Sequence, residues 1–242
     1  MLSKIRLSGN VLKIIACISM LIDHAGLMFF PDLLWLRYVG RLAFPIFAFF
    51  ISEGCRYTKN KLRYFLSVFI LGIVCQIAYQ VAYSDEQYFG ILITFSISIL
   101  LIYALQFARK TLINGKGLLV KILAVLPFVL ALIGAYCFCL RYSVDYGFMG
   151  VILPLFGAIV DFKGVKGFEK VDKPITRTLF FSVGLLLYYL QSTMKSLSVY
   201  ALLAIPFILL YNGKSGKAKL KYLFYIFYPL HLLVLAGLQL II

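Results

Sequence analysis

Charged residues are scarce in this sequence, and acidic residues are the scarcest. Of its 242 residues only 14% are charged, with 9 aspartates and glutamates against 24 lysines and arginines. A soluble domain averages about a quarter charged residues. Hydrophobic residues make up 63% of the chain, and the mean hydropathy is +0.97. A single soluble core cannot hide that much apolar surface, so we expect lipid to surround much of the chain.

Motifs for common soluble chemistry are also missing. The five cysteines lie in or beside apolar runs, and their spacing fits neither a metal site nor a secreted disulfide framework. The sequence has no phosphate-cradling glycine loop, no zinc motif and no serine nucleophile elbow. We therefore predict no metal site, and we expect the cysteines to be small buried residues.

Long apolar runs recur along the whole chain. A helix that crosses a bilayer needs about 20 apolar residues, and nine runs approach that length. With no linker and no convincing internal repeat, the pattern predicts one all-α domain over residues 1–242, a polytopic transmembrane helical bundle. The predicted spans are Val11–Phe30, Leu34–Ser52, Leu62–Val81, Phe89–Phe107, Leu118–Leu140, Tyr146–Val160, Thr178–Leu190, Leu197–Tyr211 and Tyr222–Ile241.

Basic residues gather in alternate connections between these runs. The other connections carry Asp32, Asp85, Glu86 and Asp145, with Arg141 and Lys195 as the basic exceptions. This alternation predicts a multi-pass protein of the bacterial cytoplasmic membrane, with its N-terminus in the cytoplasm and its C-terminus outside. The net charge of +15 then indicates topology and attraction to anionic lipid rather than nucleic acid. The predicted cytoplasmic groups are Arg56, Lys59, Lys61 and Arg63; Arg109, Lys110, Lys116 and Lys121; Lys163, Lys166, Lys170, Lys173 and Arg177; and Lys214, Lys217, Lys219 and Lys221.

Ionisable residues inside the predicted spans are the main candidates for function, because placing such a side chain in lipid is costly. The first span holds Asp23 and His24, and the second holds Arg37 and Arg41 one helical turn apart. The helical rise places Arg41 at a depth similar to that of His24. His231 lies near the middle of the last span, so both histidines of the chain are intramembrane.

Three further residues in these spans have alternative interpretations. Lys13 shares a helical stripe with His24, but it could also extend to the cytoplasmic surface. Glu53 lies at the cytoplasmic end of the second span and could be a solvated helix end. Pro45 removes a backbone donor there, and we expect a kink in mid-helix.

These residue types are suited to general base catalysis. An imidazole beside a carboxylate can take a proton from an amine or hydroxyl as that group attacks an acyl carbonyl. An arginine can hold a phosphate or stabilise developing negative charge. The alternative is a structural Asp23–Arg41 pair, with His24 bonded to a backbone carbonyl. A proton-coupled transporter that uses Asp23, His24 and Arg41 also stays open, as does a noncatalytic pilus or secretion assembly factor.

Five segments of the chain carry a family resemblance. The segments LKIIACISMLIDHAGLMFF and RYVGRLAFPIFAFFISEGCRYTKN, followed in order by ILITFSISIL, DYGFMGVILP and FYPLHLLVL, resemble the TraX family. That family is associated with N-acetylation of the F pilin subunit from acetyl-CoA, and it is similar to the transmembrane acyltransferases. The resemblance implies functional roles for Asp23, His24, Arg41 and Glu53, and also for His231 and Tyr228.

Residues and resemblance together predict an acyltransferase that moves an acetyl group from acetyl-CoA to an amine or hydroxyl outside the cell, on a peptide, protein or glycan. His24, oriented by Asp23, would be the general base, with His231 as the competing candidate. Arg41 would position the donor or stabilise the oxyanion, in a pocket between the first, second and last spans. The expected catalytic group is His24, Asp23, Arg41, His231 and Glu53, and the expected cofactor-binding group is Lys13, Arg37, Arg56, Lys59 and Tyr228.

Overall fold

The structure is a computed structural model that describes residues 6–83, 88–165, 167–218, 220–239 and 241. Helices dominate it, and helical structure occurs in each of the nine predicted segments, although Leu197–Tyr211 is divided among two short α-helices and a 3-10 helix. The chain folds into two compact units: Met1–Phe50 together with Lys173–Ile242, and Ile51–Asp172. Of the charged residues used to predict the topology, Asp85, Glu86, Lys166 and Lys219 lie outside the described residues.

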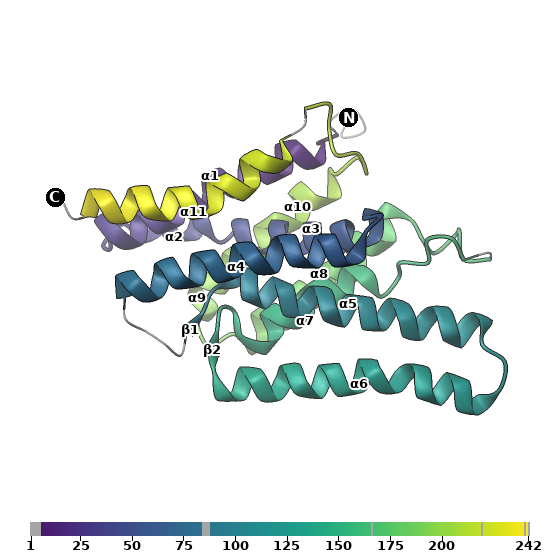
Figure 1. Ribbon diagram of the computed structural model, residues 1–242. Coiled ribbons are helices and arrows are strands. Elements are labelled where there is room, and N and C mark those ends of the chain that lie inside the picture. The colour runs from purple at the N-terminus through teal and green to yellow at the C-terminus, as the bar shows by residue number, and fades with distance from the viewer. Residues whose placement is uncertain (1–5, 84–87, 166, 219, 240, 242) are drawn as a thin grey trace. The chain divides into compact units, whose positions relative to one another are not determined.

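The first unit is built around α1, which packs against α2 and α11 (Figure 1). The hydroxyl of Ser8 accepts a hydrogen bond from the backbone N–H of Val11 at 3.4 Å and so caps the start of α1. The helices of this unit are α1 (Gly9–Phe29), α2 (Leu34–Gly40), most of α3 (Ala43–Tyr57), α8 (Pro174–Gln191), α9 (Lys195–Ser198), the 3-10 helix η2 (Val199–Leu203), α10 (Ala204–Leu209) and α11 (Lys221–Gln239).

The second predicted span consists of two helices rather than one kinked helix. Helix α2 ends at Gly40, and α3 begins at Ala43. Pro45 lies in the first turn of α3, where backbone N–H groups have no partner within the helix. The expected mid-helix kink at Pro45 is therefore wrong, since the chain breaks at Arg41 and Leu42 instead. The break leaves Arg41 at a helix end.

Helices α1 and α11 run side by side in the same direction (Figure 1). Near the starts of the two helices, the ammonium of Lys13 on α1 lies 5.6 Å from the ring centre of Phe224 on α11. Further along both helices, His24 on α1 contacts His231 on α11. Contacts thus advance together along both helices. Pro229 lies inside α11 and has no N–H to donate to the carbonyl of Tyr225. Figure 1 shows α11 bent along its length.

The second unit is built around α5, which packs against α4, α6 and α7. Two buried hydroxyls on α5 form hydrogen bonds near α7. Thr94 donates to the carbonyl of Asp145, just before α7, at 3.0 Å, and Ser98 donates to the carbonyl of Val151, within α7, at 2.7 Å. Strands β1 and β2 pair in parallel, with Tyr88 opposite Ser143. The elements are the end of α3, α4 (Lys61–Tyr83), β1 (Tyr88–Phe89), α5 (Ile91–Asn114), α6 (Leu118–Arg141), β2 (Ser143–Val144) and α7 (Gly147–Ala158).

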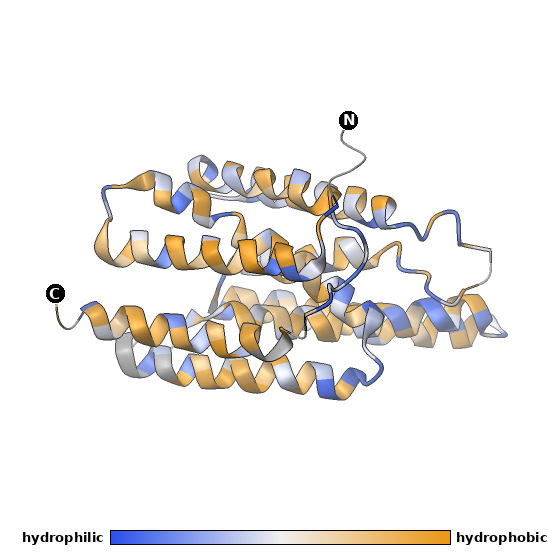
Figure 2. Ribbon diagram, turned by 90° about the horizontal axis from the view of Figure 1, so that it is seen from above, coloured by the Kyte–Doolittle hydropathy of each residue, from blue (hydrophilic) through white to orange (hydrophobic). Residues whose placement is uncertain are grey.

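Four helical stretches within the described residues are long and apolar enough to cross a membrane. Figure 2 shows hydrophobic residues concentrated on the helices and hydrophilic residues on many of the connecting segments. The count of nine spans and the cytoplasmic N-terminus stay predictions. The four stretches are Gly9–Phe29, Leu34–Tyr57, Ile91–Asn114 and Leu118–Arg141, and the shorter apolar helices are Gly147–Ala158, Lys195–Leu209 and Leu223–Gln239.

Candidate functional site

The two histidines of the chain contact each other in the first unit. Nδ1 of His24 on α1 lies 2.9 Å from Nε2 of His231 on α11. Their ring centres are 5.0 Å apart, with an angle of 29° between the ring planes. The other ring nitrogen of His231, Nδ1, lies 2.9 Å from the carbonyl oxygen of Phe227, four residues earlier on the same helix. These contacts form a chain of three groups: carbonyl, imidazole and imidazole.

The carbonyl of Phe227 determines where the protons of this chain lie. A carbonyl can only accept, so Nδ1 of His231 carries the hydrogen. In neutral His231 the Nε2 atom then has a lone pair, which accepts from Nδ1–H of His24. The remaining nitrogen of His24, Nε2, is left with its lone pair and is the basic atom of the pair. Such a directional chain is how proteins orient an imidazole for proton transfer.

Aromatic rings hold His231 in place. The ring of Phe227 stacks on it at a centroid distance of 5.0 Å and an interplanar angle of 5°, and Tyr228 meets it edge-on at 5.6 Å. His231 is only 5% exposed. Packing and the hydrogen bond to Phe227 therefore fix the ring on which His24 depends. Tyr228, expected to bind the cofactor, lies in the structure beside His231.

Asp23 pairs with an arginine rather than with His24. Its Oδ1 lies 3.3 Å from an Nη atom of Arg37, and the same nitrogen donates to the backbone carbonyl of Asp23 at 3.3 Å. The side chains are 13% and 18% exposed, respectively. Successive residues of a helix point about 100° apart, so Asp23 faces α2 while His24 faces α11. The prediction that Asp23 orients His24 is not the arrangement found here.

Helix α2 comes very close to α1 at this ion pair. A Cβ atom on Gly40 would collide with the side chain of Asp23, so this position needs glycine. Arg41 follows directly, and its charge acts on both Asp23 and His24. That Arg41 and His24 lie at a similar depth in the membrane stays a prediction. Asp23, His24, Arg37, Arg41 and His231 therefore form one cluster, which we call the His24 cluster.

Lys13 lies toward the other end of α1, between two aromatic rings. Its ammonium is 4.9 Å from the ring centre of Phe50 and 5.6 Å from that of Phe224. Both distances fit cation–π interactions. Lys13 is partly buried here rather than extended into solvent.

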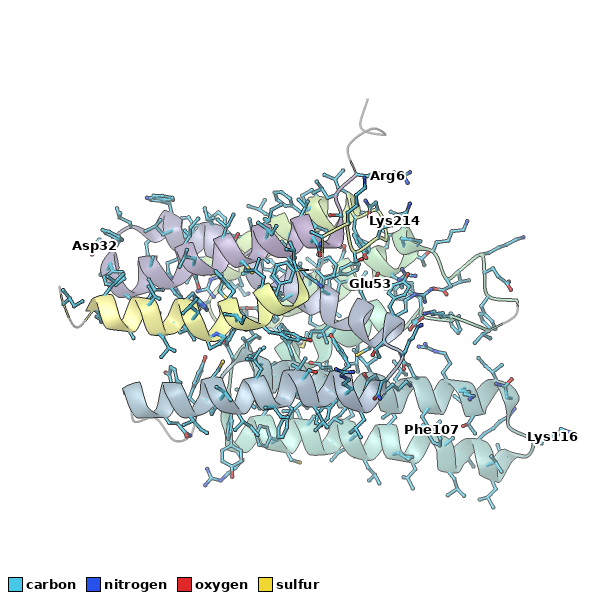
Figure 3. All side chains as sticks on the ribbon, turned by 45° about the horizontal axis from the view of Figure 1, so that its top comes forward. Arg6, Asp32, Glu53, Phe107, Lys116 and Lys214 are labelled. Atoms are coloured by element: carbon cyan, nitrogen blue, oxygen red, sulfur yellow. The ribbon has the colours of Figure 1, made fainter. Side chains whose placement is uncertain are left out.

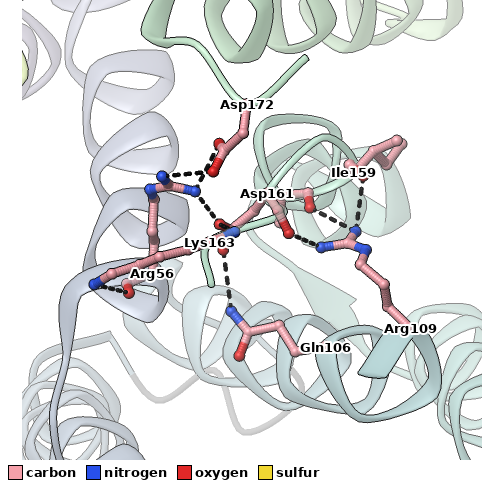
Figure 4. Close-up of polar contacts among 8 residues, drawn as sticks. Arg56, Gln106, Arg109, Ile159, Asp161, Lys163 and Asp172 are labelled. Carbon is pink, nitrogen blue, oxygen red and sulfur yellow. Dashed lines mark hydrogen bonds and ion pairs between the residues drawn. The ribbon is translucent and has the colours of Figure 1, made fainter. Parts of the chain in front are cut away.

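The remaining predicted site residues, Glu53, Arg56 and Lys59, belong to the second unit. Glu53 is only 4% exposed, so it is not a solvated helix end. Arg56 forms a bidentate pair with Asp172, with both N–O distances at 2.8 Å, and it also binds Asp161 (Figure 4). Its proposed contact with a cofactor stays a prediction, and a phosphate would have to compete with two carboxylates. Lys59 is exposed.

Asp161 is the centre of this second polar network, which the sequence reasoning missed. Gln106 donates to its carboxylate at 3.4 Å, and Arg109 donates to its backbone carbonyl (Figure 4). Arg109 also binds the carbonyls of Ala158 and Ile159 at 2.9 and 2.8 Å, which satisfies the end of α7. The network joins α3, α5 and the segment after α7. Because the side chains that bind Asp161 lie 52 or more positions from it in the chain, no local sequence pattern signals this network.

An apolar cavity of about 670 Å³ lies in the second unit between α4, α5 and α6. Its lining includes Phe69, Phe138 and Gln76. The side chain of Gln76 donates to the carbonyl of Tyr88 at 2.5 Å and accepts from the N–H of Gly90 at 3.0 Å, so its amide is already used structurally. Burial, with a contribution from Asp145, raises the pKa of Tyr88 well above its ordinary value. We find no acid or base for catalysis in this cavity's lining.

The chain is thus a helical protein with the composition of a membrane protein, and its apolar helices carry a largely buried ion pair and a pair of histidines. Within that class, the chain belongs to the TraX protein family, whose pattern matches residues 8–239. It is 28% identical, over 95% of both chains, to "Probable fimbrial assembly protein FimC, serogroup H1" of Dichelobacter nodosus. It is also 41% identical, over 28% of this chain and 25% of the other, to "Uncharacterized protein RP591" of Rickettsia prowazekii (strain Madrid E). No solved structure matches the chain.

Proposed function

We propose that this protein is an integral membrane acyltransferase that moves an acetyl group from acetyl-CoA to an amine or hydroxyl acceptor outside the cytoplasm. The observation that carries the proposal is the chain from the Phe227 carbonyl through His231 to His24. It leaves Nε2 of His24 as an oriented base on a helix that is apolar enough to cross a membrane. Within the described residues no hydrogen bond engages Nε2 of His24, so this basic atom stays available.

The proposed reaction balances with groups already present. The acceptor nitrogen or oxygen attacks the acetyl carbonyl carbon, a new C–N or C–O bond forms, and the C–S bond of the thioester breaks. Nε2 of His24 takes the acceptor's proton and then gives it to the leaving sulfur, which departs as free thiol. His231 is a positioning residue, because its hydrogen bond to Nδ1–H of His24 strengthens as His24 becomes positive. Arg41 supplies positive charge near the oxyanion.

Charge along the first unit supports a cytoplasmic N-terminus. Figure 3 labels Arg6 and Lys214 at one end of this unit and Asp32 at the opposite end. The backbone N–H of Gly9 donates to the carbonyl of Lys214 at 2.8 Å, which holds the basic segment at the start of α1. The first and last helices run in the same direction, and both start at the basic end. With an odd number of spans, the first and last spans must cross the membrane in the same direction, as these two helices do. We therefore propose that donor enters from this basic end.

The direct test is incubation of the purified protein with radiolabelled acetyl-CoA and membrane extract. The proposal predicts that label moves into an acceptor while free thiol is released in equal amount. If the protein neither binds nor consumes acetyl-CoA when pH, lipid and extract are varied, the acyltransferase proposal is wrong.

A second candidate function is that of a noncatalytic assembly factor. The name of the Dichelobacter nodosus relative, a probable fimbrial assembly protein, favours it. In that case the imidazoles of the His24 cluster would carry out no chemistry that assembly needs. Replacing His24 and His231 by alanine would then leave pilus assembly intact in cells, whereas the acyltransferase proposal predicts its loss wherever acetylation is required.

A further inference from the structure

The ammonium of Lys13 lacks the acidic partner that a partly buried cation normally has. Within the part of the chain that the structure describes, no carboxylate pairs with Lys13 and no oxygen accepts a hydrogen bond from it. Its neighbours are the faces of Phe50 and Phe224. Ring faces attract the cation, but they leave its three N–H donors unused. A lysine in an apolar helix with free donors is a candidate anion site.

Other basic residues surround the same end of α1. The segment that contains Lys214 and Lys217 crosses the start of the helix, held by bonds from Gly9 N–H to the Lys214 carbonyl and from Asn10 N–H to the Ser215 carbonyl, both at 2.8 Å. Lys214 and Lys217 are exposed, as is Arg6 just before the helix. An anion approaching Lys13 from this end therefore meets positive charge first.

The spacing between Lys13 and His24 identifies the kind of anion. The two residues are eleven positions apart on one face of α1, which corresponds to about 16 Å at 1.5 Å per residue. A phosphopantetheine arm has about 13 bonds between its phosphorus and its sulfur. At about 1.2 Å of extension per bond, as in an extended peptide chain, that arm spans about 16 Å. Its phosphate can reach Lys13 while its thioester lies at His24.

We propose that Lys13 binds the phosphate of a phosphopantetheine thioester whose acyl group lies at His24. This proposal rests on the acyltransferase function above and adds the subsite that sets donor length. Cys17 and Met20 lie on the same stripe of α1 between the two ends and are each only 7% exposed, so the arm would lie along α1 beside this buried stripe. The proposal also moves the phosphate site away from Arg56, whose guanidinium already binds Asp161 and Asp172.

The test compares three acetyl donors: acetyl-CoA, acetyl-phosphopantetheine and acetyl-pantetheine, which has no phosphate. Each is assayed with the wild-type protein, Lys13→Met, Lys13→Arg and the control Lys116→Met, which removes an exposed lysine of the second unit. Unfolding midpoints of all four proteins check that each one folds, and Lys13→Arg keeps the charge if Lys13→Met is unstable.

We expect Lys13→Met to raise KM for acetyl-CoA and acetyl-phosphopantetheine by about tenfold or more, since a charged hydrogen bond is lost. The KM for acetyl-pantetheine should not change, and Lys13→Arg should recover most of the loss. If wild type has a lower KM for acetyl-CoA than for acetyl-phosphopantetheine, the nucleotide is bound too, which favours coenzyme A. Equal values favour an acyl carrier protein as the natural donor.

Two results would overturn the proposal and can be told apart. If wild type transfers acetyl groups but Lys13→Met leaves every KM unchanged, or raises that for acetyl-pantetheine equally, then Lys13 does not bind the phosphate. If wild type transfers from none of the three donors, the acyltransferase function fails and the subsite fails with it.

Discussion

Nδ1 of His24 lies 2.9 Å from Nε2 of His231, although 207 positions separate the two residues in the chain. The contact joins the first and last helices of the chain, α1 and α11, within one compact unit. It gives His231 a role through His24, rather than as a second, independent base.

Replacing His231 should impair catalysis according to whether the substitute accepts a hydrogen bond. In His231→Gln the amide oxygen can still accept from Nδ1–H of His24, whereas in His231→Leu nothing accepts. We expect kcat to fall about tenfold with glutamine and about a hundredfold or more with leucine, while the donor's KM stays constant. Steady-state kinetics of both variants is the measurement. Equal losses in kcat would contradict the role of the hydrogen bond.

The ion pair between Asp23 and Arg37 should stabilise the fold as a unit. Removing one partner from a buried pair typically costs about 3–5 kcal/mol, and these slightly exposed side chains should lie near the lower limit. We expect Asp23→Asn and Arg37→Met each to lower the unfolding midpoint, and the double variant to lose less than the sum of the two. A double-mutant cycle on unfolding in detergent measures this coupling. Strict additivity would show that the pair is not energetically coupled.

Gly40 should tolerate no side chain, because α2 approaches Asp23 there. Gly40→Ala would force the two helices apart, at a cost of about 1–3 kcal/mol. The matched control is Gly237→Ala in α11, where an added Cβ meets nothing within 4 Å. Alanine there should stabilise the helix by up to about 1 kcal/mol. Thermal unfolding of both variants should therefore give shifts of opposite sign, and a neutral Gly40→Ala would argue against the close approach.

Arg56 should be needed for stability rather than for binding the donor. Arg56→Ala would remove the guanidinium that binds the carboxylates of Asp161 and Asp172, at a cost of about 3–5 kcal/mol. Arg63→Ala, an exposed arginine in α4, should change stability by less than about 0.5 kcal/mol. Unfolding reports the first effect, and the KM for acetyl-CoA tests the second. A raised KM with unchanged stability would restore Arg56 as a cofactor residue.

The two ends of the first unit should be accessible from opposite sides of the membrane. In a variant whose five cysteines are replaced by serine, a membrane-impermeant maleimide should label Asp32→Cys in intact cells. The same reagent should label Ser215→Cys only after the membrane is opened. Both positions are exposed in the structure. Labelling of Ser215→Cys in intact cells would reverse the proposed orientation.

Hydropathy was sufficient to predict the helices but not their ends. Each apolar run became helical because the backbone polar groups must be satisfied wherever water is excluded. The division between α2 and α3 was missed because Pro45 was read as a residue of the helix interior. Whether a proline kinks a helix or begins one depends on where the preceding turn ends, and here that depends on the packing of Gly40 against α1.

The site was only partly predictable, for a similar reason. The high cost of a charge in an apolar helix selected Asp23, Arg37, Arg41 and both histidines from residue types alone. It could not assign partners, because neighbours in sequence face different helices. Arg56 illustrates the same point, since its carboxylate partners lie 105 and 116 positions away. No local pattern identifies contacts at such separations.

The central claim, that Nε2 of His24 is the catalytic base, is tested most directly by the turnover of His24→Gln with saturating acetyl-CoA and acceptor. Glutamine is uncharged and similar in size, but it cannot take a proton from the acceptor. The account predicts that kcat falls about 10²- to 10⁴-fold while the unfolding midpoint and the KM for acetyl-CoA stay close to wild type. A His24→Gln protein that turns over at the wild-type rate would contradict it.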